Sequence, residues 1–219
     1  MKLALLLPGY LESADYRHLV VIDEELSGLE YEVKRVDPCF LWTTGNVENY
    51  TLTNYIKQIK EIIDSCEKGS LEEVVLIGHS LGAAAAIIVG VNDARITKVV
   101  CLSPTVELDK SREKWGESGT RCSKKDLPND PSSFREFCIP LSHFDDRKQY
   151  SVIDALRDLT IPIMFLFGTD DPSADEIQGV ADSAKISKVV KIENMSHDFR
   201  QSLDLCNQVA GEVKRFLAD

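Results

Sequence analysis

The sequence has no Cys-x-x-Cys pair, and its four histidines do not complete the ligand spacing of a zinc site. These absences argue against a metal-binding module, so we expect no metal. The six cysteines stand apart from one another, and Cys66, Cys101 and Cys206 fall in apolar runs that are typical of small core residues. Such cysteine usage predicts reduced thiols and a cytoplasmic location.

Positive charge is also scarce, since 25 Lys and Arg stand against 36 Asp and Glu for a net charge of −11. That balance argues against nucleic acid and anionic membranes as partners. The sequence has no apolar stretch long enough for a membrane span. The length of 219 residues predicts one domain, with or without an insertion.

Apolar runs alternate with amphipathic segments along the chain. The runs that predict strands cover 3–7, 31–36, 74–77, 98–102, 161–167 and 188–192. The segments that predict helices cover about 14–28, 51–67, 81–91, 151–159, 173–184 and 205–217. Strands that are mostly apolar throughout and separated by helices are typical of a parallel sheet covered on both faces. We therefore expect an α/β fold, a three-layer sandwich around a mainly parallel six-stranded sheet.

One turn in this pattern carries a motif, Gly78-His79-Ser80-Leu81-Gly82, between the third strand and an apolar helix. A sharp strand-to-helix turn strains its central residue, and flanking glycines remove the side chains that would clash. The start of the helix directs free N–H groups toward whatever Ser80 holds. The pattern predicts a nucleophilic serine. The alternative is a chance match, but most chance matches would lack this flanking strand and helix.

A serine hydroxyl needs a base to take its proton. His197 follows the last strand, at the sheet edge where ligands of parallel sheets bind, and is the favoured candidate. His143 is the alternative. We expect His79 to point elsewhere on the turn and His18 to be exposed on its helix.

The base in turn needs a carboxylate that orients it. Asp170 and Asp171 both follow the strand 161–167, and either one fits this role. The other then belongs to the turn or caps the next helix.

The elbow around Ser80, the Gly-x-x-Asp turn at 168–171 and the late His197 together resemble the α/β-hydrolase superfamily over nearly the whole chain. The resemblance implies an α/β-hydrolase fold of the esterase and lipase-like branch. It also implies a catalytic triad of Ser80, Asp171 and His197, since the register of the acid turn favours Asp171 over Asp170.

The same resemblance implies an oxyanion hole built from the backbone N–H groups of Leu81 and Tyr10. Pro8-Gly9 stands where the family often has His-Gly. No cofactor and no metal are implied.

Residues 105–157 interrupt the alternation and are too long for a connecting loop, which predicts an inserted subdomain. The resemblance implies that this insertion is a lid. Residues 110–125 carry an excess of four positive charges, from six Lys or Arg against two Glu. Such a cluster either forms a solvated surface or attracts an anionic acyl substrate or a partner. Four aromatic residues either line an acyl pocket or form the lid's own small core, and the small core is the favoured prediction: Trp115, Phe134, Phe137 and Phe144.

The function expected from these features is hydrolysis of carboxylic esters through an acyl-enzyme on Ser80, with a small-molecule acyl substrate. Thioester hydrolysis, amide hydrolysis and acyl transfer use the same residues and stay open. A binding protein without turnover is the alternative from another class, because a fold alone does not specify function.

Overall fold

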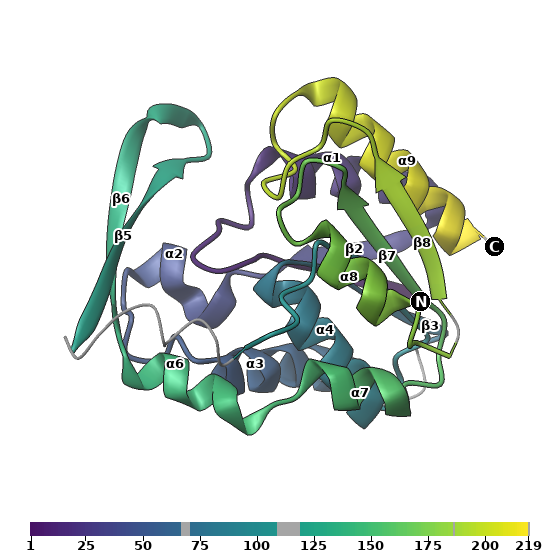
Figure 1. The fold of residues 1–219 in the computed structure, drawn as a ribbon, viewed down its shortest axis with the longest axis horizontal. Coiled ribbons are helices and arrows are strands. Elements are labelled where there is room, and N and C mark those ends of the chain that lie inside the picture. The colour runs from purple at the N-terminus through teal and green to yellow at the C-terminus, as the bar shows by residue number, and fades with distance from the viewer. Residues whose placement is uncertain (67–70, 109–118, 186, 219) are drawn as a thin grey trace.

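The computed structural model describes residues 1–66, 71–108, 119–185 and 187–218 (Figure 1). Its strands are β1 (Lys2–Leu7), β2 (Tyr31–Arg35), β3 (Glu73–His79), β4 (Lys98–Leu102), β5 (Thr120–Leu127), β6 (Asp130–Pro140), β7 (Ile163–Gly168) and β8 (Ser187–Ile192). Its α-helices are α1 (Arg17–Leu26), α2 (Leu41–Thr44), α3 (Leu52–Asp64), α4 (Leu81–Asn92), α6 (Ser142–Asp146), α7 (Val152–Asp158), α8 (Ala174–Ala181) and α9 (Leu203–Ala218). Short 3₁₀ turns cover Ser27–Leu29, Pro38–Phe40 and Arg147–Gln149.

The six strands expected from the sequence form one sheet, in the order β2-β1-β3-β4-β7-β8. Every neighbouring pair in it is parallel. The predicted α/β fold class is confirmed, and β2 lies at one edge of the sheet. Because all six strands run the same way, their carboxyl ends share one edge of the sheet, and the turns after β1, β3, β4, β7 and β8 meet there.

The sheet is the middle of three layers (Figure 1). Alternate residues of a strand point to opposite faces, so β3 buries Val74 and Leu76 on one side and Val75 and Ile77 on the other. The first face packs against α3, α4, α7 and α8, and the second against α1 and α9. This double burial explains why the strands are apolar throughout.

The insertion predicted at 105–157 contains an antiparallel hairpin, β5–β6, which stands out from the sheet (Figure 1). The sequence did not predict these two strands. Charged residues occupy much of β5, and Pro131 and Pro140 lie near the ends of β6, a residue type that ordinarily argues against a strand. The hairpin is therefore held by its own pairing and by contacts to the rest of the chain.

The aromatic residues of the insertion do not form a core of their own. Phe137 and Phe144 are buried with Leu11, Leu41 and Tyr50, which belong to the segments after β1 and β2. Phe134 is 62% exposed. The prediction of a separate lid core is wrong for these three residues, and Trp115 lies outside the described part of the chain, as do Lys110, Arg112 and Lys114 of the predicted basic cluster.

The cysteines only partly match the expectation. Cys101 and Cys206 are buried and Cys66 is half-buried, and all three are free thiols. Cys122 and Cys138, however, face each other across β5 and β6 and form a disulfide. The prediction of reduced thiols is wrong at this pair, and the cytoplasmic location stays a prediction without its cysteine argument.

The helices in the described part of the chain do not combine the length and the apolar character that crossing a membrane requires.

Candidate active site

Ser80 occupies a sharp turn between β3 and α4. Its φ of 50° and ψ of −112° lie in a region that residues with a side chain rarely adopt. A Cβ at Gly78 would lie 2.4 Å from the Ala83 nitrogen, and one at Gly82 would lie 2.0 Å from the Leu7 carbonyl oxygen. Glycine at both positions is therefore what allows the turn, and the turn exposes the Ser80 hydroxyl beyond the carboxyl edge of the sheet.

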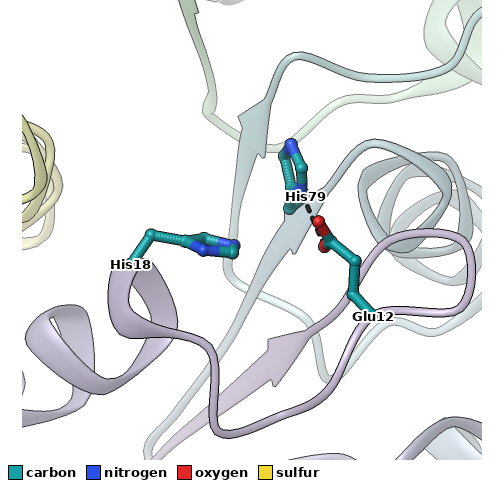
Figure 2. Close-up of side chains that lie close together, drawn as sticks. All are labelled: Glu12, His18 and His79. Carbon is teal, nitrogen blue, oxygen red and sulfur yellow. Dashed lines mark hydrogen bonds and ion pairs between the residues drawn. The ribbon is translucent and has the colours of Figure 1, made fainter. Parts of the chain in front are cut away.

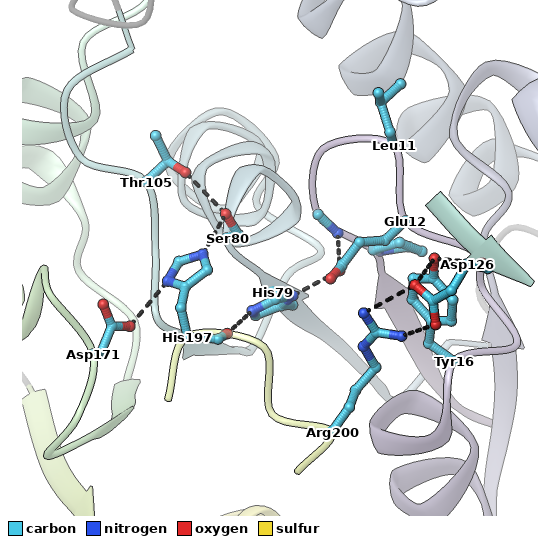
Figure 3. A network of polar contacts seen from close by, with 12 residues as sticks. Leu11, Glu12, Tyr16, His79, Ser80, Thr105, Asp126, Asp171, His197 and Arg200 are labelled. Atoms are coloured by element: carbon cyan, nitrogen blue, oxygen red, sulfur yellow. Dashed lines mark hydrogen bonds and ion pairs between the residues drawn. The ribbon is translucent and has the colours of Figure 1, made fainter. Parts of the chain in front are cut away.

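The structure brings Ser80, His197 and Asp171 together (Figure 3). His197 Nε2 lies 3.1 Å from Ser80 Oγ, and His197 Nδ1 lies 2.9 Å from Asp171 Oδ2. The carboxylate only accepts, so Nδ1 carries the proton and donates it to Asp171. In the neutral ring Nε2 is then free to accept from the Ser80 hydroxyl, which is the arrangement of a nucleophile beside its base.

The two competing candidates lie apart from this chain of contacts. Asp170 is exposed, and its carboxylate accepts from the neighbouring Thr169 hydroxyl at 3.4 Å. His143 lies in α6, where its Nδ1 is buried without a hydrogen-bond partner among the described residues. Of the carboxylates and imidazoles weighed in the sequence, the structure joins Asp171 and His197 to Ser80.

Asp171 is almost fully buried yet strongly acidic. Burial alone raises the pKa of its carboxyl, but the hydrogen bonds it accepts, led by the one from His197, bring the pKa down to about 2. The backbone N–H of Ser173 donates to its second oxygen at 2.8 Å. Asp171 is thus a fixed, ionised acceptor for the His197 ring.

Leu81 and Tyr10, whose N–H groups are expected to form an oxyanion hole, belong to two turns that meet at Ser80. Leu81 is the first residue of α4, where backbone N–H groups have no partner within the helix. Tyr10 follows Gly9, and a Cβ on Gly9 would lie 3.1 Å from Ser80 Cβ, so the turn after β1 runs directly against the nucleophile. This close approach is why position 9 is a glycine.

A buried ion pair beside the elbow holds this turn in place, and sequence reasoning missed it. Glu12 Oε2 accepts from the Gly9 N–H at 2.8 Å and lies 2.6 Å from His79 Nδ1 (Figure 3). His79 Nε2 lies 2.7 Å from the carbonyl oxygen of His197. Because both acceptors are oxygens without a proton, both nitrogens of His79 donate and the ring is an imidazolium. Burial alone lowers the pKa of His79, but the Glu12 carboxylate raises it above the usual value.

His18 lies beside this pair and is fully buried, so the prediction of an exposed His18 is wrong (Figure 2). Burial lowers the pKa of His18 to about 3, which keeps the ring neutral. Its ring packs edge-on against His79 with the centroids 5.0 Å apart. Helix α1 turns this position inward, whereas the charged neighbours in the sequence suggested the outside.

Glu12, His18 and His79 are also the described residues that most resemble a metal site, since one ligand atom from each lies within 4.8 Å of the others. A metal ligand must offer a lone pair, and both nitrogens of His79 are engaged as donors. Glu12 and His79 therefore form an ion pair, and the neutral His18 ring packs against it.

Thr105 is a further contact that the sequence did not indicate. Its Oγ1 lies 3.1 Å from Ser80 Oγ, and its backbone N–H donates to the Ser80 carbonyl at 3.1 Å (Figure 3). With the Ser80 proton directed at His197, the Thr105 hydroxyl donates to Ser80. Ser80 follows β3 and Thr105 follows β4. Because these two strands are paired in parallel, the sheet holds the two hydroxyls close together.

We expect Glu12→Gln to destabilise the protein by about 3–5 kcal/mol, because it leaves the buried His79 imidazolium without its counter-ion. Folding lowers the pKa of Glu12 below its ordinary 4.5, as the attraction of His79 outweighs burial. The part of the stabilisation that depends on ionised Glu12 is thus complete above pH 4.5 and is lost on acidification, whereas the part that depends on the raised pKa of His79 is lost as the pH rises through that pKa. Urea unfolding of the wild type and of Glu12→Gln, at pH values above and below 4.5, measures the destabilisation and its loss on acidification.

Glu25→Gln is the matched control, because Glu25 forms an exposed ion pair with Lys214 at 2.7 Å. Removing such a pair is expected to cost less than about 1 kcal/mol. Equal losses in the two variants would contradict a special role for the buried pair.

No family model and no curated protein sequence matches the chain. Solved structures do match over its whole length. Est1E from Butyrivibrio proteoclasticus has a TM-score of 0.77 at 19% identity, over 99% of this chain and 87% of that one. A monoacylglycerol lipase from Paleococcus ferrophilus has a TM-score of 0.71 at 18% identity, over 98% of this chain and 93% of that one. Alpha/beta hydrolase domain-containing protein 10 from mouse has a TM-score of 0.69 at 18% identity, over 99% of this chain and 89% of that one.

Proposed function

Because the chain has the α/β-hydrolase fold, we propose that it is a serine hydrolase that cleaves carboxylic esters of small molecules. The observation that carries the proposal is the unbroken chain of contacts from Asp171 through His197 to Ser80, with separations of 2.9 and 3.1 Å. Three side chains from three separate turns converge there, in the order of contacts that acyl transfer requires. The named solved structures include a monoacylglycerol lipase, which agrees with this reaction class.

In the proposed reaction, Ser80 Oγ attacks the ester carbonyl carbon while its proton passes to His197 Nε2. The tetrahedral intermediate collapses, the alcohol leaves with the proton from His197, and the acyl group stays on Ser80. Water then attacks the acyl-enzyme, giving its proton to His197. The acid departs, and the proton returns to Ser80 Oγ.

The Leu81 and Tyr10 N–H groups are proposed to stabilise the negative oxygen of the intermediate. Each such donor typically contributes a factor of about 10² to 10³ in rate. Glu12 and His79 act as positioning residues in this scheme. One ion pair holds the Gly9 N–H on one side of Ser80 and the His197 carbonyl on the other.

We also propose that residues 1–219 form one domain and that 105–157 act as its lid. The hairpin β5–β6 supports this arrangement, because Asp126 at its end accepts a hydrogen bond from the Tyr16 hydroxyl. Asp126 also forms an ion pair with Arg200 at 2.7 Å, three residues after His197. The insertion thus reaches the two loops that border the proposed site.

Thioester hydrolysis, amide hydrolysis and acyl transfer remain variants of this proposal that use the same residues. A fluorophosphonate probe tests what they share. We expect one probe per chain in the native protein, with the added mass on the peptide that contains Ser80. Turnover of short- to long-chain nitrophenyl esters should then give the acyl preference.

Heat-denatured protein is the control for the probe, since unactivated serines do not react with it. A native protein that stays unlabelled and turns over no ester would favour a binding protein. Label on another serine, such as Ser103, would contradict the assignment of the nucleophile.

A further inference from the structure

Arg147 is a buried cation that forms no ion pair with a carboxylate in the described part of the chain. It lies in the 3₁₀ turn after α6 and is 7% exposed. Its guanidinium carbon lies 4.7 Å from the ring centroid of Phe144 and 5.0 Å from that of Tyr10. Within the described residues the guanidinium donates no hydrogen bond and pairs with no carboxylate. A charge removed from water in this way is costly unless something binds it.

A second arginine approaches the same two rings. The Arg121 guanidinium lies 5.4 Å from the Tyr10 centroid and 5.9 Å from that of Phe144. Burial lowers the pKa of both guanidiniums, and the charge of Arg121 lowers the pKa of Arg147 further. Two like charges gathered on one pair of aromatic rings form a region suited to an anion.

The shared ring of Tyr10 ties this region to the nucleophile. Tyr10 follows Gly9, whose backbone runs against Ser80. The Tyr10 hydroxyl is buried and has no hydrogen-bond partner in the described ranges. An unpaired O–H donor thus lies on the same ring as the two cations, one residue from the turn that contacts Ser80.

Arg200 shows how an arginine with a structural role is arranged in this molecule. It lies 4.0 Å from the ring centroid of Tyr16, so it also packs on an aromatic face. Unlike Arg147, it pairs with a carboxylate, that of Asp126, at 2.7 Å. Packing on rings therefore does not by itself explain why Arg147 lacks such a partner.

We propose that Arg147, with Arg121 and the Tyr10 hydroxyl, binds a carboxylate carried by the substrate beside Ser80. The preferred substrates are then esters that bear a carboxylate at a distance from the scissile bond, such as half-esters of dicarboxylic acids. The planar guanidinium fork matches a carboxylate in two parallel hydrogen bonds. This inference rests on the proposed function and names its substrate class.

The kinetic test compares monoethyl glutarate and monoethyl adipate with the neutral diethyl esters, by titration of the acid released. A second series places the charge on the alcohol, with 3-acetoxypropanoate against its methyl ester. We expect the anionic member of at least one series to have a kcat/KM about 10- to 100-fold higher. Arg147→Met should reduce that ratio at least tenfold, and Arg147→Lys should reduce it less.

Arg200→Met is the matched control, since it removes a ring-packed arginine that already has a carboxylate partner and should leave the ratio unchanged. Wild-type ratios near one in both series would overturn the proposal. An Arg147→Met that melts below the assay temperature is replaced by Arg147→Lys, and a preference unaffected by that substitution would also overturn it.

Binding without turnover separates this inference from the proposed function. In Ser80→Ala, glutarate should raise the melting temperature, and Arg147→Lys in that background should weaken the effect. If no ester is cleaved but glutarate binds through Arg147, the anion site stands and the proposed function fails. Stabilisation by inorganic phosphate but not by glutarate would overturn the carboxylate as the bound group.

Discussion

Ser80→Ala is expected to lower kcat for ester hydrolysis about 10⁶-fold without unfolding the protein. The substitution removes the only atom that forms the acyl-enzyme in the proposed reaction, and losses of this size follow removal of a nucleophile from an established triad. The fold should tolerate it, because the strained turn depends on Gly78 and Gly82 rather than on the hydroxyl. Rates and melting temperatures of the wild type and the variant measure the two effects.

The combination with His197→Ala sharpens this prediction. Residues that act as one unit give losses that do not add, so the double variant should be about as slow as either single one. Ser183→Ala is the control, since that hydroxyl donates to the Val180 carbonyl at 2.7 Å in the exposed turn after α8. A Ser80→Ala variant within tenfold of wild type would show that the acyl group is transferred elsewhere or not at all.

The main elements of the fold were predictable because their signals are local. Val74 to Ile77 fill both faces of the sheet, so the strand is apolar at every position. Glycine at 78 and 82 indicates a tight turn, because neither residue has a side chain that would clash there. Ser80 lies between them and is therefore the residue that the turn presents. Short-range patterns of this kind are readable without knowing what packs against them.

The ion pair of Glu12 and His79 was not predictable in this way. The two residues are 67 positions apart, and no spacing or periodicity connects them. His18 was misplaced for a related reason, since charged neighbours suggested an exposed position while the structure buries it against His79. The disulfide of Cys122 and Cys138 depends on a hairpin whose charged first strand gave no strand signal.

Arg147 belongs with these unpredicted features. In the sequence it is one more cation in a charged insertion, and the hypothesis of an anionic substrate rested instead on residues 110–125. Only Arg121, Lys124 and Lys125 of that cluster lie in described residues. The contact of Arg121 with the Tyr10 ring agrees with part of that hypothesis. The buried arginine on the same ring, Arg147, lies outside residues 110–125.

Asp171→Asn is expected to lower kcat about 10⁴-fold, whereas Asp170→Asn should stay within about threefold of the wild type. An asparagine at 171 fits the same space, but its amide can donate to His197 Nδ1 and so stabilise the tautomer that has its proton on Nε2. That tautomer cannot accept from Ser80. The Asp170 carboxylate is exposed and contacts Thr169, so the same change there leaves the His197 ring as it is.

The acid also gives a stability signature that is independent of turnover. Folding lowers the pKa of Asp171 from 3.8 to about 2, so its stabilisation is complete above pH 3.8 and is lost as the pH falls through 2. Asp171→Asn should remove this part of the pH dependence of unfolding, and Asp170→Asn should keep it. If Asp170→Asn were the slower enzyme while Asp171→Asn kept its activity, the carboxylate that orients His197 in solution would not be the one that lies 2.9 Å from it here, and the loop after β7 would have to rearrange before catalysis.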